Sequence, residues 1–199
     1  MINYWIDMDG VLAQYDRNGY KGPNPPYLDP HAHYFRERIP DKKMLTVIEC
    51  LNSRYPGHVY VLTRVSEKGR LFLRQISDKA EWLAKHCPFL NLEEQFIPIV
   101  SEKNNFVQAF YRPVRLGMSR GDILIDDYNK NLDAWDKAGG TAVKYCNGIN
   151  TPNKNEPKAS WMGLHLNEDL SEAEILSILG VLRAYPGKLH IDDKEAALP

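Results

Sequence analysis

The stretch Tyr4–Asp16, YWIDMDGVLAQYD, decides how the rest of the chain is interpreted. An apolar run ends at Asp7 and Asp9, which are separated by one residue, and Gly10 follows. Two carboxylates this close repel each other, so they need a shared proton or a cation. A turn also favours Asp and Gly, whereas a calcium loop needs a third acidic or Asn position and a later Gly. Taken alone, the stretch leaves a turn and a functional site as alternatives.

Five short apolar runs predict β-strands, at residues 2–6, 58–63, 95–100, 122–125 and 141–145. Apolar residues with the period of a helix occur in segments 41–55, 75–87, 129–139 and after the capping box of Ser171 and Glu174. Strands alternating with helices indicate an α/β fold with a doubly wound parallel sheet. Ligands bind such sheets outside the carboxyl ends of the strands, so the residues there are the candidates for function.

Two segments interrupt the alternation. Residues 13–40 contain five prolines and many aromatic side chains, and we interpret them as a small cap insert over the ligand-binding end of the sheet. We therefore assign residues 1–12 and 41–185 to the core domain and residues 186–199 to a C-terminal tail. Residues 147–163 are expected to form a polar surface loop.

The composition is that of an ordinary globular protein, with 199 residues, 43% hydrophobic and 26% charged side chains, and a net charge of −1. The near-zero charge gives no general attraction to nucleic acid or to a membrane surface. Cys50, Cys87 and Cys146 are widely spaced and odd in number, which indicates a reducing compartment. We see no secretory signal and no apolar run of the roughly 20 residues that span a bilayer. We therefore expect a cytoplasmic protein.

A second acidic pair, Asp126 and Asp127, ends the predicted strand at 122–125. A helix cap accounts for one aspartate but not for two. Together with Asp7 and Asp9, the pair forms an oxygen-rich set of ligands of the kind that Mg²⁺ prefers.

Two other predicted strands are followed by groups suited to phosphate. Thr63 brings a hydroxyl with Arg64 next to it, and Lys103 follows the strand at 95–100. Each has an ordinary alternative, since Thr caps helices and Lys is usually solvated. At one sheet edge they would provide hydrogen-bond donors and positive charge for a phosphate.

The chain thus contains D-x-D-G, then Thr, then Lys, then D-D, each after its own predicted strand. This order resembles the haloacid dehalogenase-like (HAD) superfamily of phosphotransferases, over residues 3 to about 145. Response-regulator receiver domains use similar groups, but their acidic pair comes only first. The phrases DMDGVL, SDKAEWLAKH, IVSEKN and DILIDDYNKNL are most similar to the 5′(3′)-deoxyribonucleotidases. The chain departs from that group at Arg64, where a small hydroxyl residue is expected, and at Tyr128, where Arg is often found.

The resemblance implies that Asp7 is the nucleophile and forms an aspartyl-phosphate. Asp9 would protonate the leaving alkoxide and then deprotonate the attacking water. A dehalogenase of the superfamily needs no acid at this position, so Asp9 favours a phosphatase or phosphomutase. Gly10 would let the chain turn sharply, so that backbone N–H groups face the phosphoryl oxygens.

The same resemblance implies a magnesium ion on the Asp7 carboxylate, the Asp9 backbone carbonyl and one acid of the pair Asp126 and Asp127, with the other acid binding through water. Spacing leaves open which of the two binds directly. The phosphate would be bound by the Thr63 hydroxyl and by Lys103, with Arg64 beside them.

The insert carries the aromatic rings Tyr15, Tyr34 and Phe35, which could stack on a nucleobase. Their alternative role is to fill a miniature core inside the insert. His31 and His33 form an H-x-H pair. With no further Cys or His nearby, we interpret them as cap or surface residues rather than zinc ligands.

These observations predict a magnesium-dependent phosphatase that hydrolyses nucleoside monophosphates, with deoxynucleotides as the first choice. Two alternatives remain: a phosphatase for another small phosphate ester such as a sugar phosphate, and a non-catalytic phosphate-binding module of the same fold. The intact set of acidic, hydroxyl and lysine residues argues against the last. The expected partner is a small molecule, and the oligomeric state stays open, a homodimer included.

Overall fold

The computed structural model describes residues 2–14, 26–29, 31–105, 121–147 and 161–186. Six parallel strands form one sheet in the order β3-β2-β1-β4-β5-β6. The strands are β1 (Tyr4–Ile6), β2 (Val59–Arg64), β3 (Phe96–Ile99), β4 (Ile123–Asp126), β5 (Thr141–Tyr145) and β6 (Leu164–Leu166). The five predicted strands are confirmed. The short strand β6 was not predicted, because its three residues give too little apolar pattern.

The helices are α1 (Lys42–Arg54), α2 (Gly69–His86), α3 (Leu92–Gln95), α5 (Asn129–Lys137) and α6 (Glu172–Ala184), with a 3-10 turn η1 at Pro26–Leu28. The four predicted helices are present, and the capping box of Ser171 and Glu174 is formed at α6. Helix α2 begins six residues before the predicted segment. Its N-cap residue, Lys68, makes no side-chain capping bond, so the sequence has no start signal there.

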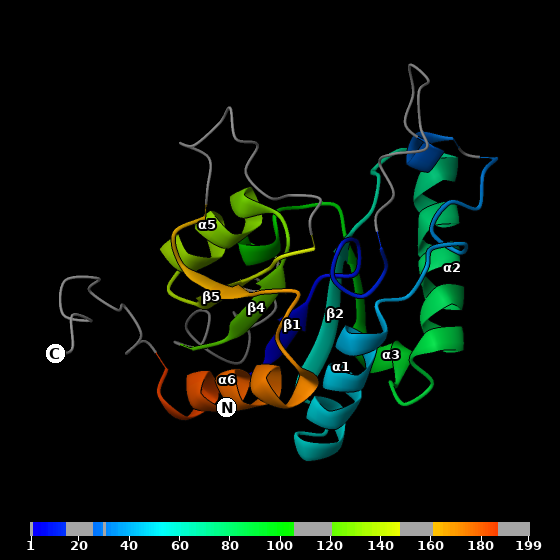
Figure 1. The fold of residues 1–199 in the computed structure, drawn as a ribbon. Helices are drawn as coiled ribbons and strands as arrows, with labels where there is room; N and C mark the ends of the chain where they lie inside the picture. Colours follow the sequence, from blue (N-terminus) through cyan, green and yellow to red (C-terminus); the bar gives the residue numbers. More distant parts are fainter. Residues whose placement is uncertain (1, 15–25, 30, 106–120, 148–160, 187–199) are drawn as a thin grey trace, which may run out of the picture.

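Alternate residues of the central strand β1 bury opposite faces of the sheet. Tyr4 and Ile6 belong to a core cluster shared with α1, α2 and α6, whereas Trp5 packs with Leu132 and Trp135 of α5. Figure 1 shows α1 and α6 together on one side and α5 beside β4 and β5. The doubly wound α/β architecture is therefore the predicted one.

The described part of the insert leaves and rejoins the core at one point. Ala13 forms an antiparallel bridge with Pro40, and Gln14 N–H donates to the carbonyl of Ile39. The segment from 31 to 40 then lies along α2, where Trp82 Nε1 donates to the carbonyl of Arg38 at 2.7 Å (Figure 1). The division into core, insert and tail remains a prediction, because residues 15–25 and 187–199 lie outside the described residues.

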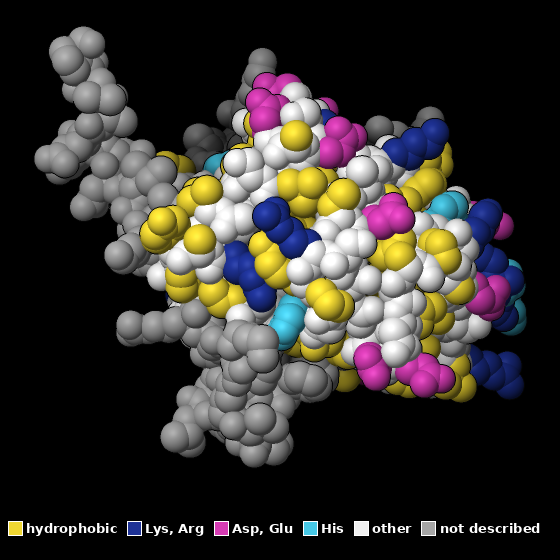
Figure 2. Space-filling view, turned by 90° about the horizontal axis from the view of Figure 1, so that it is seen from below, with side chains coloured by type: hydrophobic (Ala, Val, Ile, Leu, Met, Phe, Trp, Pro, Cys, Tyr) yellow, Lys and Arg dark blue, Asp and Glu magenta, His cyan; other side chains and the backbone are white. Residues whose placement is uncertain are grey.

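Seen from below, the molecule shows small groups of hydrophobic side chains among acidic and basic ones (Figure 2). Within the described ranges, no helix has both the length and the apolar character needed to cross a bilayer.

Candidate active site

The chain turns back on itself directly after β1. Met8 O accepts hydrogen bonds from the amides of residues 11 to 13, and Gly10 N–H donates to Ala13 O at 2.8 Å. Gly10 has a φ of +90°, and a Cβ there would lie 2.2 Å from Asp127 Oδ2. Gly10 thus allows the turn to approach Asp127 closely. The sharp turn expected at Gly10 is present, and the N–H of Gly10 itself is used inside it. The phosphate-binding role of this turn stays a prediction.

Three carboxylates gather at the carboxyl ends of β1 and β4. One oxygen each of Asp7, Asp126 and Asp127 lies within 4.8 Å of the others, and all three residues are buried. The register of the sheet brings them together, because Ile6 pairs with Ile125 in the neighbouring parallel strand. The residues that follow each strand therefore meet at the same edge.

Lys103 connects the two strands through these carboxylates. Its Nζ lies 2.7 Å from Asp7 Oδ1 and 2.7 Å from Asp126 Oδ2, and the side chain is buried. Burial alone would lower the pKa of Lys103, but the carboxylates of Asp126 and Asp7 outweigh it and raise this pKa. Burial, reinforced by Asp126, raises the pKa of Asp7 well above its usual value, although Lys103 opposes the rise.

Two asparagines that the sequence analysis did not single out hold the acidic pair in place. Asn131 Nδ2 donates to Asp126 Oδ2 at 2.9 Å. Asn147 Nδ2 donates to Asp127 Oδ2 at 3.0 Å and to Gly10 O at 2.5 Å. Asparagine is common in loops and at helix ends, so sequence pattern alone gives no signal for these roles.

A second cluster forms around Asp9 and contains a residue that was missed. Lys79 Nζ lies 2.5 Å from Asp9 Oδ2, and it donates to Thr63 Oγ1 at 2.6 Å and to the carbonyl of Arg64 at 2.8 Å. Thr63 Oγ1 lies 3.4 Å from the same Asp9 oxygen. Lys79 and Thr63 have no exposed surface. A lysine with no contact to water needs such partners, because an isolated buried charge is very costly.

The signal for Lys79 lies in the helix period. Gln75, Lys79 and Trp82 are all buried residues of α2 and have the i, i+4, i+7 spacing of one helix face. A search for apolar residues alone identifies a neighbouring set of positions on α2 and passes over Lys79. A search for polar residues that share a helix face with apolar ones would therefore have identified Lys79.

The remaining predicted residues differ in their surroundings. Arg64 is half exposed, and its Nη1 lies 3.9 Å from Glu102 Oε1. Tyr34 and Phe35 are 7% and 6% exposed and pack edge to face with ring centroids 5.0 Å apart. Lys79 Nζ lies 4.4 Å from the centroid of the Phe35 ring, so the insert covers the Asp9 cluster. Tyr15 lies outside the described residues.

The charges at this edge suit a divalent cation. Asp7, Asp126 and Asp127 form one cluster of carboxylates, and Asp9 lies close enough to raise the pKa of Asp7. Lys79 contacts Asp9, Lys103 contacts Asp7 and Asp126, and the buried Lys144 donates to the backbone carbonyl of Asp127. Asp9 Oδ1 is buried and has no hydrogen-bond partner among the described residues. Hard, negatively charged carboxylate oxygens are the ligands that Mg²⁺ prefers.

No family model and no curated protein matches the sequence. Fourteen chains of solved structures are similar to this one, and two of them are described here. One is a D,D-heptose 1,7-bisphosphate phosphatase from B. bronchiseptica complexed with magnesium and phosphate, with 18% identity and a TM-score of 0.56 over 91% of this chain and 99% of that one. The other is a D,D-heptose 1,7-bisphosphate phosphatase from Burkholderia thailandensis, with 12% identity and a TM-score of 0.53 over 89% and 97%. At these identities the likeness concerns the fold, and it confirms the predicted doubly wound α/β class.

Proposed function

We propose that the chain is a magnesium-dependent phosphatase for small phosphate monoesters. The observation that carries the proposal is the joint arrangement at one sheet edge of Asp7, held by Lys103, and Asp9, held by Lys79. A buried carboxylate beside a second carboxylate with its own cation is suited to a nucleophile and an acid–base group. The named activity and the bound magnesium and phosphate of one similar structure support the proposal. A non-catalytic phosphate-binding module would not need the Asp9 cluster.

In this mechanism Asp7 attacks phosphorus with a carboxylate oxygen. Met8 N–H and Lys103 both bond to Oδ1, so we assign the attack to Oδ2. The bond from phosphorus to the ester oxygen breaks as the new bond forms, and an aspartyl-phosphate results. Water then attacks the phosphorus, which releases phosphate and restores the Asp7 carboxylate.

Asp9 moves the proton in both steps. Its Oδ2 is held by Lys79 and Thr63, whereas its buried Oδ1 has no partner among the described residues. We assign to Oδ1 the transfer of a proton to the leaving oxygen and its later removal from water. Lys79 positions this carboxyl group, and Thr63 and Lys103 are the proposed phosphate-binding residues.

We propose that Asp7, Asp126 and Asp127, with the backbone carbonyl of Asp9, would hold the Mg²⁺ ion. When bound, the ion would offset the negative charge of the phosphate and polarise the phosphoryl group. Lys103 contacts both Asp7 and Asp126 and so holds these two carboxylates together.

For the substrate, a sugar phosphate is now the better candidate than a nucleoside monophosphate. Both similar structures are named as phosphatases of a sugar bisphosphate. Tyr34 and Phe35 are buried in the insert, which favours their alternative role as a miniature core over stacking on a base. The nucleotide assignment continues to rest on the four deoxyribonucleotidase-like phrases.

The experiment is a panel of sugar phosphates, sugar bisphosphates, deoxynucleoside monophosphates and an aryl phosphate, with phosphate release measured with Mg²⁺ and with chelator. We expect turnover that requires a divalent cation and that is lost in Asp7→Asn. Absence of turnover on every ester, together with phosphate binding that requires Mg²⁺, would favour the non-catalytic module.

A further inference from the structure

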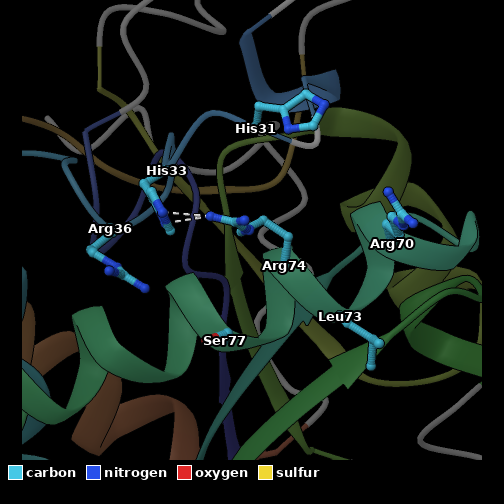
Figure 3. Close-up of a pocket in the computed structure, with 7 residues that line it drawn as sticks. All are labelled: His31, His33, Arg36, Arg70, Leu73, Arg74 and Ser77. Atoms are coloured by element: carbon cyan, nitrogen blue, oxygen red, sulfur yellow. Dashed lines mark hydrogen bonds between the residues drawn. The ribbon is translucent and has the colours of Figure 1, made fainter.

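A pocket of about 640 Å³ lies between the insert and α2, apart from the carboxylates at the sheet edge. Figure 3 shows that its wall combines His31, His33 and Arg36 of the insert with Arg70, Leu73 and Arg74 of α2. The α2 residues follow helix spacing and form one stripe of the helix. Lys79, which contacts Asp9, belongs to the buried face of the same helix.

The positive charges of the pocket are only partly neutralised. Arg36 has acidic partners, since its Nη2 lies 2.6 Å from Glu81 and 3.4 Å from the buried Asp78. Arg74 contacts an imidazole and no carboxylate among the described residues, and Arg70 has no ion pair among them. Among the described residues, the acids beside this wall are Asp78 and Glu81, and Arg36 contacts both. Two guanidinium groups remain for an anion.

Arg74 is held in a fixed direction by the insert. Its Nη1 lies 2.5 Å from His33 Nε2 and 3.0 Å from His33 Nδ1 (Figure 3). His33 Nδ1 also lies 2.8 Å from Asp78 Oδ1. If Nδ1–H donates to Asp78, Nε2 is the ring nitrogen that accepts from Arg74. The guanidinium is therefore ordered without being neutralised, which lowers the entropy lost when a ligand binds.

We propose that this pocket is a second binding site, for a phosphate group of a small molecule. Guanidinium groups bind phosphate through paired N–H donors. Arg74 is directed at His33, and the guanidinium of Arg70, one helical turn away, lies apart from it (Figure 3). We therefore expect Arg70 to turn towards a phosphate that is bound at Arg74. Leu73, which is 67% exposed, lies in sequence between the two arginines and offers an apolar surface to the uncharged part of the ligand. The site does not depend on the proposed phosphatase activity.

The phosphate can come from two sources, and both use the same chemistry. It can be free inorganic phosphate, or it can be the distal phosphate of a substrate that carries two. Binding of inorganic phosphate measured without divalent cations reports on the pocket, because the four carboxylates of the sheet edge then repel an anion.

The test is calorimetric titration of inorganic phosphate into the full chain with chelator, at constant ionic strength and in a phosphate-free buffer. Wild type is expected to bind, and Arg70→Gln and Arg74→Gln to bind about tenfold more weakly or worse, a loss of one charge-assisted contact. Lys85→Gln removes the same charge from an exposed position of α2 outside the pocket and should bind like wild type. No binding to wild type, or equal weakening in all three variants, would overturn the proposal.

The source follows from kinetics on a sugar bisphosphate and its matching monophosphate. A loss of kcat/KM confined to the bisphosphate in Arg74→Gln identifies the distal phosphate of a substrate. If Arg74→Gln changes kcat/KM equally for the bisphosphate and the monophosphate, and wild type binds free phosphate, the ligand of the pocket is inorganic phosphate. Because the titration needs no turnover, an inactive protein would leave the test of the pocket intact.

Discussion

Lys79 Nζ lies 2.5 Å from Asp9 Oδ2, and Lys79 has no exposed surface. The carboxylate proposed to move protons is thereby attached to α2, whereas Asp7 contacts Lys103, which follows β3. The two acids that follow β1 therefore have separate cations, and each cation comes from a different part of the chain. This separation allows two neighbouring carboxylates to serve different steps.

Replacing Lys79 by Met should lower turnover of alkyl phosphates about tenfold or more, because Asp9 is no longer held beside the leaving oxygen. Hydrolysis of p-nitrophenyl phosphate should fall less, since that leaving group needs little protonation. Steady-state kinetics on both substrates measure the difference. Lys85→Met, on the exposed side of α2, is the control, and equal losses on both substrates would argue against the positioning role.

Asp9→Asn tests the proton donor itself. We expect formation of the aspartyl-phosphate from an alkyl ester to slow by about 100-fold or more, within the usual range for general acid catalysis. The same step with an aryl phosphate should change much less. Rapid-quench measurements of this first step on the two esters compare them directly, and a similar slowing of both would exclude Asp9 as the acid.

Gly10→Ala should destabilise the protein more than Gly57→Ala does. Both glycines have positive φ, +90° and +74°, so both variants include the strain of a left-handed backbone. Only at Gly10 does the added Cβ meet another group, Asp127 Oδ2 at 2.2 Å, while at Gly57 nothing lies within 4 Å. Overpacking costs about 1–3 kcal/mol, and denaturant unfolding should give a difference of that size. Equal destabilisation would mean that the turn moves away from Asp127 without cost.

Asp7→Asn should stabilise the metal-free protein at neutral pH. Burial and the nearby carboxylates raise the pKa of Asp7 well above its usual value, whereas in the unfolded chain this group ionises near pH 4. Above about pH 4 the folded state thus holds the extra proton, and stability falls as pH rises through the folded-state pKa.

Unfolding of both proteins in chelator, from about pH 5 to about pH 8, measures this effect. The decline should be weaker in Asp7→Asn, and Mg²⁺ should stabilise wild type more than the variant, because a ligand of the native state shifts the equilibrium. A variant less stable than wild type in chelator at neutral pH would show that Lys103 outweighs burial.

The fold could be predicted because its strands are apolar on both faces and its helices keep their period. The parallel sheet then fixes where strand ends meet, which is why the sequence alone predicts that Asp7 lies near the pair Asp126 and Asp127. Strand β6 was missed because three residues, Leu-His-Leu, hold too little pattern.

The parts of the site that were missed are those set by tertiary contacts. Lys79 is ordinary in sequence and becomes notable only when α2 turns it towards Asp9. Asn131 and Asn147 act on neighbours that are close in space, at sequence separations of 5 and 20 residues from their aspartates. The basic pocket depends on Arg74 meeting His33 across 41 residues. No local pattern encodes such contacts.

The most direct measurement of the central claim is to stop turnover of a phosphate ester with acid and locate the phosphoryl group by mass spectrometry of peptides. We expect one phosphoryl group on Asp7 in wild type with Mg²⁺, a larger labelled fraction in a variant slow in the second step, and no label in Asp7→Asn. Turnover by a well-folded Asp7→Asn at the wild-type rate, or wild-type turnover with the label on another residue, would contradict it.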